Sequence, residues 1–95
     1  MSQASEKVSA RFTIVNDLGL HARAATKLVQ LASKFPCEVH LTHEGQTANA
    51  KSVMGVLLLC GSKGTVIEVT AVGAEAEVCV ASIGELIASR FGEPS

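Results

Sequence analysis

The chain has 95 residues, enough for one small domain, because domains usually run to about 100–150 residues and a second hydrophobic core could not be filled. Apolar residues make up 47% of the chain and charged residues 18%, which excludes disordered, collagen-like and low-complexity proteins. Eight Lys and Arg against nine Asp and Glu leave a net charge of -1, so nothing in the composition attracts a polyanion, and nucleic-acid binding is disfavoured.

The first half of the chain begins with a polar stretch, and we expect residues 1–7 to form a flexible tail. From Val8 to Val15 apolar and polar residues alternate, which predicts a half-buried strand. Turn residues follow at Asn16–Gly19. Apolar residues then recur at spacings of three and four, which predicts an amphipathic helix over Ala22–Lys34 that ends before Pro36.

The middle of the chain has the pattern of a hairpin followed by a short helix. Cys37–His43 alternates between apolar and polar residues, and Glu44–Gly45 turns the chain into a second short strand at Gln46–Ala50. Ser52 carries a side-chain oxygen at the place where it could cap a helix over Val53–Leu59.

The last third of the chain is predicted to form a strand and a long helix. Thr65–Val72 alternates, and the side that carries Ile67 is expected to face the core. After a glycine, the apolar spacing predicts an amphipathic helix over Ala74–Phe91, stopped by Gly92 and Pro94. The order β-α-β-β-α-β-α predicts an α+β domain over residues 8–92, with a four-stranded, mostly antiparallel sheet and three helices on one face.

The cysteines and the apolar stretches indicate a cytoplasmic protein. Cys37, Cys60 and Cys79 are odd in number and widely spaced, so we expect three small buried hydrophobic residues and no disulfide framework. The amino-terminal residues lack the apolar stretch of a signal peptide. The longest uncharged apolar stretch, Ser52–Ser62, is short of the roughly 20 residues that span a bilayer, so no membrane insertion is expected.

His21 is the candidate reactive residue, because it stands at a strand-to-helix turn with Arg23 two positions later. Unpaired N–H groups and the macrodipole at a helix N-terminus stabilise an anion, and imidazole is a competent nucleophile near neutral pH. Spacing alone favours a plainer alternative, in which His21 only caps the helix and Arg23 is a solvated charge. No metal site is expected, because His40 and His43 point to opposite sides of a strand.

Two segments, Gly19–Ala25 (GLHARAA) and Ala50–Val56 (AKSVMGV), closely resemble the two signature segments of HPr, the phosphocarrier family of the bacterial phosphoenolpyruvate-dependent phosphotransferase system. The resemblance extends over Ala10–Phe91 and implies the open-faced β-sandwich of that family. It implies that His21 accepts a phosphoryl group on Nδ1 from enzyme I and passes it to an EIIA-type protein, while Arg23 steadies the group. The chain would then be a monomeric carrier without a cofactor, rather than an enzyme.

Two positions depart from the family pattern. Ala24 follows Arg23 where the family normally has proline, and we expect a slightly looser helix start from it. Leu18 stands where the sugar-transporting branch has a polar residue and resembles the nitrogen-related branch, NPr. Both branches, sugar transport and nitrogen-related regulation, therefore remain open.

Ser52 has two open interpretations. Lys51–Val56 is similar to the version of this segment found where a dedicated HPr kinase phosphorylates the serine, and a phosphate there would weaken docking of enzyme I. Alternatively, Ser52 is only a helix N-cap.

The predicted helix after Ser52 has more apolar residues than one buried face can hold, so some must be exposed and available for docking. By the resemblance, Val53, Met54 and Leu57 lie on the face that meets enzyme I and other partners. Leu20, Ala24 and Lys27 are also expected to bind partners, although a solvated helix face is the commoner explanation for Lys27. The rival hypothesis is a non-catalytic regulatory module that binds partners through the Val53–Leu58 surface without transferring phosphate.

Overall fold

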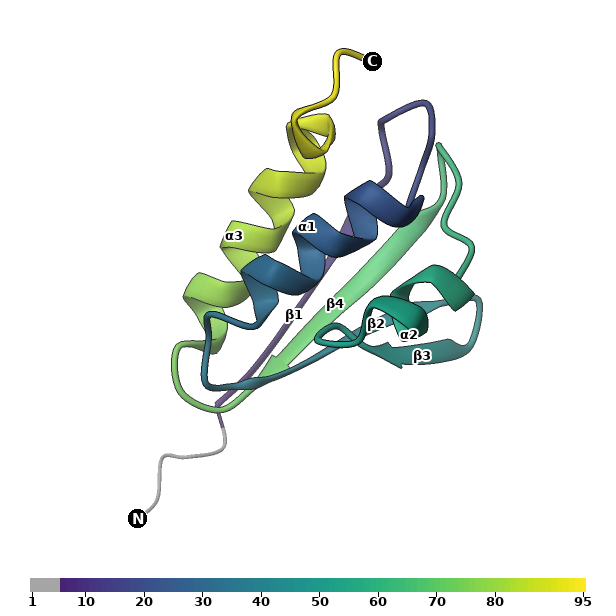
Figure 1. Cartoon of the computed structure of the whole chain (residues 1–95). Coiled ribbons are helices and arrows are strands. Elements are labelled where there is room, and N and C mark those ends of the chain that lie inside the picture. The colour runs from purple at the N-terminus through teal and green to yellow at the C-terminus, as the bar shows by residue number, and fades with distance from the viewer. Residues whose placement is uncertain (1–5) are drawn as a thin grey trace.

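The structure is a computed structural model that describes residues 6–95, so most of the tail expected at residues 1–7 lies outside the described residues. Figure 1 shows a sheet with all three helices packed on one side. The elements are β1 (Lys7–Thr13), α1 (Ala22–Ala32), β2 (Glu38–His43), β3 (Gln46–Asn49), α2 (Val53–Leu58), β4 (Val66–Val72), α3 (Ala76–Ala88) and a 3-10 turn (Arg90–Gly92). Lys7 already pairs within β1, so the strand begins one residue earlier than expected.

The sheet has the strand order β1-β4-β2-β3, and every neighbouring pair is antiparallel. The chain passes from β1 through α1 to β2 and leaves a gap in the sheet, which β4 later fills. The α+β architecture expected from the element order, with its antiparallel sheet and helices on one face, is therefore confirmed.

The two faces of the sheet differ as the alternation predicts. Ile67, Val69 and Ala71 of β4 are almost wholly buried under the helices. On the other face, Ser9 and Thr70 share a hydrogen bond of 2.9 Å between their hydroxyl oxygens. The open face of the sheet is thus polar, and the core lies between the sheet and the helices.

The last helix is shorter than predicted at both ends. It begins at Ala76 because Gly73 and Glu75 adopt left-handed backbone conformations, with φ of 122° and 65°. It ends at Ala88, and Phe91 lies beyond it in a left-handed turn with φ of 55°. Phe91 is buried as expected, with 1% of its surface exposed, but the turn brings it into the core rather than the helix.

The prediction of three buried cysteines is wrong for Cys60. This residue follows the end of α2 with φ of 53°, and the turn leaves its side chain exposed. Cys37 and Cys79 are buried as expected. Burial, followed by the neighbouring Cys37, raises the pKa of the Cys79 thiol to about 12, so this thiol stays protonated and unreactive.

Residues 6–95 contain neither a cluster of metal ligands nor a helix able to span a membrane. No three His, Cys, Asp or Glu side chains come together there in a way that could hold a metal ion. Within the same range, the helices are all too short or too polar to cross a bilayer. His40 and His43 lie on β2 and are half-buried.

Candidate functional site

His21 is the N-cap of α1, as the sequence predicts. Its backbone is extended, with φ of -77° and ψ of -179°, and its Nδ1 accepts a hydrogen bond from the backbone N–H of Arg23 at 3.3 Å. The side chain is 26% exposed. The helix begins at Ala22, so Ala24 in place of the proline usual in the resembled family does not shift its start. Nδ1 of His21 therefore faces the N-terminus of α1, on a side chain that is partly exposed to solvent.

The loop before His21 is held in place by a close approach to the loop after α2. Gly19 has φ of 67°, and a Cβ there would lie 2.5 Å from the carbonyl oxygen of Gly61. The backbone N–H of Leu20 donates to that same oxygen at 2.8 Å. Only glycine fits at position 19, because a side chain would both strain the backbone and push the two loops apart.

Glu93 is the residue of the site that sequence reasoning missed. Its Oε2 is hydrogen-bonded to Nε2 of His21, and its Oε1 accepts from Nδ2 of the buried Asn16 at 2.9 Å. The hydrogen bonds from His21 and then from Asn16 hold the pKa of the Glu93 carboxyl below its usual 4.5. No periodicity or motif singles out Glu93, because it lies 72 positions from His21 and beyond the last helix.

The basic residues expected at the site have different placements. Arg23 is the exposed second residue of α1, and its backbone N–H is the group that contacts Nδ1 of His21. The Lys27 ammonium donates to the carbonyl oxygen of Phe91 at 2.7 Å, so it ties α1 to the segment after α3. Arg23 is therefore the basic side chain available to an anion at the helix start, and Lys27 serves the packing of the chain's last residues.

Two of the expected partner-binding residues are in the core. Leu20 is 5% exposed and Ala24 is fully buried. Leu20 packs toward Gly61, and Ala24 lies on the buried side of α1. Their side chains pack in the core beneath the start of α1. Neither side chain therefore lies on a surface that a partner could contact, which corrects the expectation that Leu20 and Ala24 are partner-binding residues.

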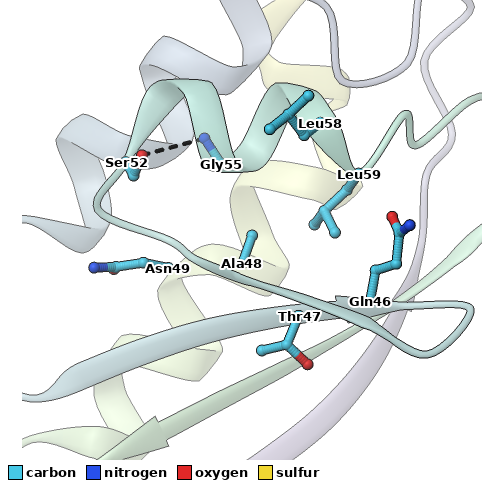
Figure 2. A pocket seen from close by; sticks show the side chains of 8 residues that line it. All are labelled: Gln46, Thr47, Ala48, Asn49, Ser52, Gly55, Leu58 and Leu59. Carbon is cyan, nitrogen blue, oxygen red and sulfur yellow. Dashed lines mark hydrogen bonds between the residues drawn. The ribbon is translucent and has the colours of Figure 1, made fainter.

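Ser52 is the N-cap of α2, as predicted, and its Oγ accepts a hydrogen bond from the backbone N–H of Gly55 at 3.1 Å (Figure 2). A groove of about 660 Å³ lies beside it, between β3 and α2 (Figure 2). The residues that line the groove are Gln46, Thr47, Ala48, Asn49, Ser52, Gly55, Leu58 and Leu59. The groove does not include His21, and none of its side chains titrates near neutral pH, so it is separate from the reactive site.

The exposed apolar surface expected on α2 is present. Met54 is 67% exposed and Leu58 is 69% exposed, whereas Val53 and Leu57 are partly buried against the core. Leu58 lies within the Val53–Leu58 surface of the rival hypothesis but is not among the individual residues expected to bind partners. The direction of its side chain depends on how this two-turn helix packs, which the sequence does not show. Leu18, in the loop before His21, is also 69% exposed.

Comparison with known proteins places this arrangement in a family. Residues 8–89 match the family described as "PTS HPr component phosphorylation site". The chain is 48% identical to "Phosphocarrier protein HPr" of Xylella fastidiosa, over 85% of this chain and 91% of the relative. It is 40% identical to "Phosphocarrier protein NPr" of Shewanella violacea, over 94% and 98%. The crystal structure of HPr-C-His from Thermoanaerobacter tengcongensis superposes with a TM-score of 0.85, at 38% identity over 95% of this chain and 99% of that one.

Proposed function

The chain belongs to the HPr family of phosphocarrier proteins of the phosphotransferase system, and from that premise we propose that His21 is its phosphoryl acceptor. Nδ1 attacks the phosphorus of a phosphorylated donor, an N–P bond forms, and the bond from phosphorus to the donor breaks with its electron pair left on the donor. The second transfer repeats these steps with His21 as the leaving group. The observation that carries this proposal is the Nδ1 atom itself, because it accepts the Arg23 N–H at 3.3 Å and so presents a lone pair at the helix start.

The start of α1 favours the phosphorylated state. The first N–H groups of a helix have no partner within it, and the macrodipole adds a partial positive charge there. A phosphoryl group on Nδ1 would take the place of that nitrogen as acceptor for the Arg23 N–H, and the exposed Arg23 side chain in the same turn supplies a positive charge. Ala24 adds a further backbone N–H in the first turn, which a proline at this position would lack.

We propose that enzyme I is the donor and an EIIA-type protein the acceptor, in sugar uptake or in nitrogen-related regulation in the cytoplasm. The family supports this route, because its members are components of the phosphotransferase system. The exposed Met54 and Leu58 supply an apolar surface on α2 for docking. The chain is then a covalently modified carrier and has no turnover of its own.

We also propose that Ser52 is a regulatory phosphorylation site for an HPr kinase. Its Oγ already lies at the N-terminus of α2, where a phosphate would accept the Gly55 N–H in place of the hydroxyl. The added negative charge would stand beside the exposed Met54 and weaken the docking of enzyme I to that apolar surface.

Labelling with phosphoenolpyruvate and enzyme I tests the proposal. The wild-type chain should gain an acid-labile, alkali-stable phosphoryl group, and His21→Ala should abolish the label. His40→Ala is the matched control, because His40 is a half-buried histidine on β2 and should label normally. A His21→Ala chain that still labels would overturn the assignment.

The rival hypothesis, a regulatory module that binds partners without transferring phosphate, is favoured by the exposed α2 surface alone. It predicts that binding to an unphosphorylated partner is indifferent to His21→Ala and is lost with Met54→Asp and Leu58→Asp. It also predicts no label on the wild-type chain, so the same labelling experiment separates the two.

A further inference from the structure

The segment after α3 makes a left-handed turn and then contacts the start of α1. We call residues 90–95 the C-terminal strap. Arg90, Phe91 and Gly92 have φ of 60°, 55° and 79°, three left-handed residues in a row. A left-handed conformation is unfavourable for a residue other than glycine, so packing must hold the turn in place. Figure 1 shows the strap at the same end of the molecule as the loop before α1.

The strap is anchored along its length. The Phe91 side chain is buried, and its carbonyl oxygen accepts from the Lys27 ammonium at 2.7 Å. Further along, the carbonyl oxygen of Ser95 accepts from the backbone N–H of Asp17 at 3.2 Å. These contacts join the strap to α1 and to the loop that leads into it. Together with the strained turn, they fix the position of Glu93.

The Glu93 carboxylate is enclosed between two donors. Its side chain is only 9% exposed, with Oε2 on Nε2 of His21 and Oε1 on Nδ2 of Asn16. The same Nδ2 donates to the Gly19 carbonyl oxygen at 2.9 Å, while Oδ1 of Asn16 is buried without a hydrogen-bond partner among residues 6–95. The amide is thus oriented for donation, because turning it over would place its oxygen against two acceptors.

The ring of His21 has one proton arrangement in this network. An ionised carboxylate can only accept, so Nε2 carries the hydrogen, and Nδ1 keeps its lone pair toward the Arg23 N–H. We propose that Glu93 is a positioning residue for phosphoryl transfer: it holds the His21 ring by Nε2–H, with Nδ1 directed at the helix start, before and after phosphorylation. This inference rests on the proposed function of His21, and it assigns a role to the strap that carries Glu93.

The contact itself is tested by NMR on the unphosphorylated ¹⁵N-labelled protein, which needs no partner. Wild type should show a slowly exchanging, low-field proton on ¹⁵Nε2 of His21. Glu93→Ala should lose it, and Glu93→Gln should keep a weaker signal, because the amide oxygen still accepts. The control is Glu85→Ala, which removes an exposed carboxylate from α3. A His21 signal that is the same in wild type and Glu93→Ala would overturn the proposal.

The consequence for transfer is tested with enzyme I and phosphoenolpyruvate. Glu93→Ala should lower kcat for phosphorylation of this chain on the order of tenfold with little change in KM, as expected for a lost orienting partner. Glu93→Gln should fall between, and Glu85→Ala should match wild type. Equal kcat in Glu93→Ala and wild type, or a change confined to KM, would overturn the positioning role. Absence of label on wild-type His21 would instead end the proposed function, while the NMR result would still stand for the contact.

Discussion

The starts of α1 and α2 are built in opposite ways, although each begins with a side chain that can carry a phosphoryl group. At α2 the contacts that cap the helix are local. Ser52 Oγ accepts the Gly55 N–H at 3.1 Å, and Asn49 Oδ1 accepts the Lys51 N–H at 2.9 Å, so the residues of each pair lie no more than three positions apart. The cap of α2 is therefore made within its own segment, although the Lys51 ammonium also donates to the more distant carbonyl oxygen of Phe35 at 2.7 Å.

At α1 the contacts come from distant segments. The Leu20 N–H donates to Gly61 at 2.8 Å, and the His21 ring is paired with Glu93, 72 positions later. The cap contact of His21 is also the longer of the two, at 3.3 Å. The ring is therefore supported on its Nε2 side. Under the proposed function, Nδ1 would exchange its longer contact for a phosphoryl group while the ring stays in place.

Under the proposed functions of the two residues, this difference would distinguish a carrier site at His21 from a regulatory site at Ser52. At Ser52 the capping atom is also the atom that a phosphate would modify, so phosphorylation changes the helix start itself. At His21 holding and reacting are assigned to different nitrogens of one ring. We infer that the second design suits a group that is gained and lost in every cycle, since the site returns to the same geometry each time.

Gly19→Ala should have the largest effect on the α1 start. The substitution forces a left-handed alanine and places its Cβ 2.5 Å from Gly61 O, so we expect the free energy of unfolding to fall by about 2–4 kcal/mol. Gly45→Ala is the matched control: φ is 82°, but a Cβ there meets nothing within 4 Å, and about 1 kcal/mol should be lost. Urea unfolding measures both, and similar losses would show that the contact between the two loops does not matter. Labelling of His21 should slow only in Gly19→Ala.

Ser52→Ala should have a moderate effect, confined to stability. Loss of the N-cap hydrogen bond typically costs about 1 kcal/mol, and α2 is only 6 residues long, so the cap serves a large part of the helix. Thermal or urea unfolding checks the loss against Ser33→Ala, an exposed serine just after α1. His21 should label at the wild-type rate in Ser52→Ala. Slower labelling there would mean that the two helix starts are coupled.

The same contrast explains what the sequence could predict. The cap at Ser52 could be predicted because it involves only the residues that directly follow it, up to Gly55. The buried side of β4 could be predicted from the alternation of apolar and polar residues along the strand, which is also a local signal. Glu93 could not be found this way, because its position depends on a left-handed turn at Phe91. In the sequence, Phe91 continues the helical spacing of the apolar residues before it, so nothing local reveals that turn. The burial of Leu20 could not be predicted either, because Leu20 packs toward Gly61, which is distant in the sequence.

The signature segments predict the protein family more reliably than they predict which side chains face solvent. The two segments that resemble HPr predicted the family correctly, which the comparisons confirm. They gave no sign that Ala24 faces the core while Met54 faces solvent, because a motif fixes residue types and the packing of each helix fixes direction. Strand order likewise had to come from the structure.

The smallest effect is expected from Lys63→Met, which removes the only salt bridge between the two loops among residues 6–95. Lys63 Nζ lies 2.7 Å from Asp17 Oδ1, and both side chains are more than half exposed, at 58% and 54%. The hydrogen bond from Lys63, then that from Ser95, lowers the pKa of Asp17 from 3.8, so the pairing stabilises the fold above that pH and is lost as the pH falls through the lowered value.

Lys63→Met should therefore flatten the loss of stability on acidification below about pH 3.8 and leave the neutral protein almost unchanged. Thermal unfolding across the acid range measures the slope, and about 1 M NaCl should reduce the difference between the two chains, because the Debye length is then only about 3 Å. Lys34→Met, an exposed lysine just after α1, is the control. A large change in stability at neutral pH would mean that this exposed pair, and not the backbone contact of Leu20 with Gly61, joins the loop before α1 to the loop after α2.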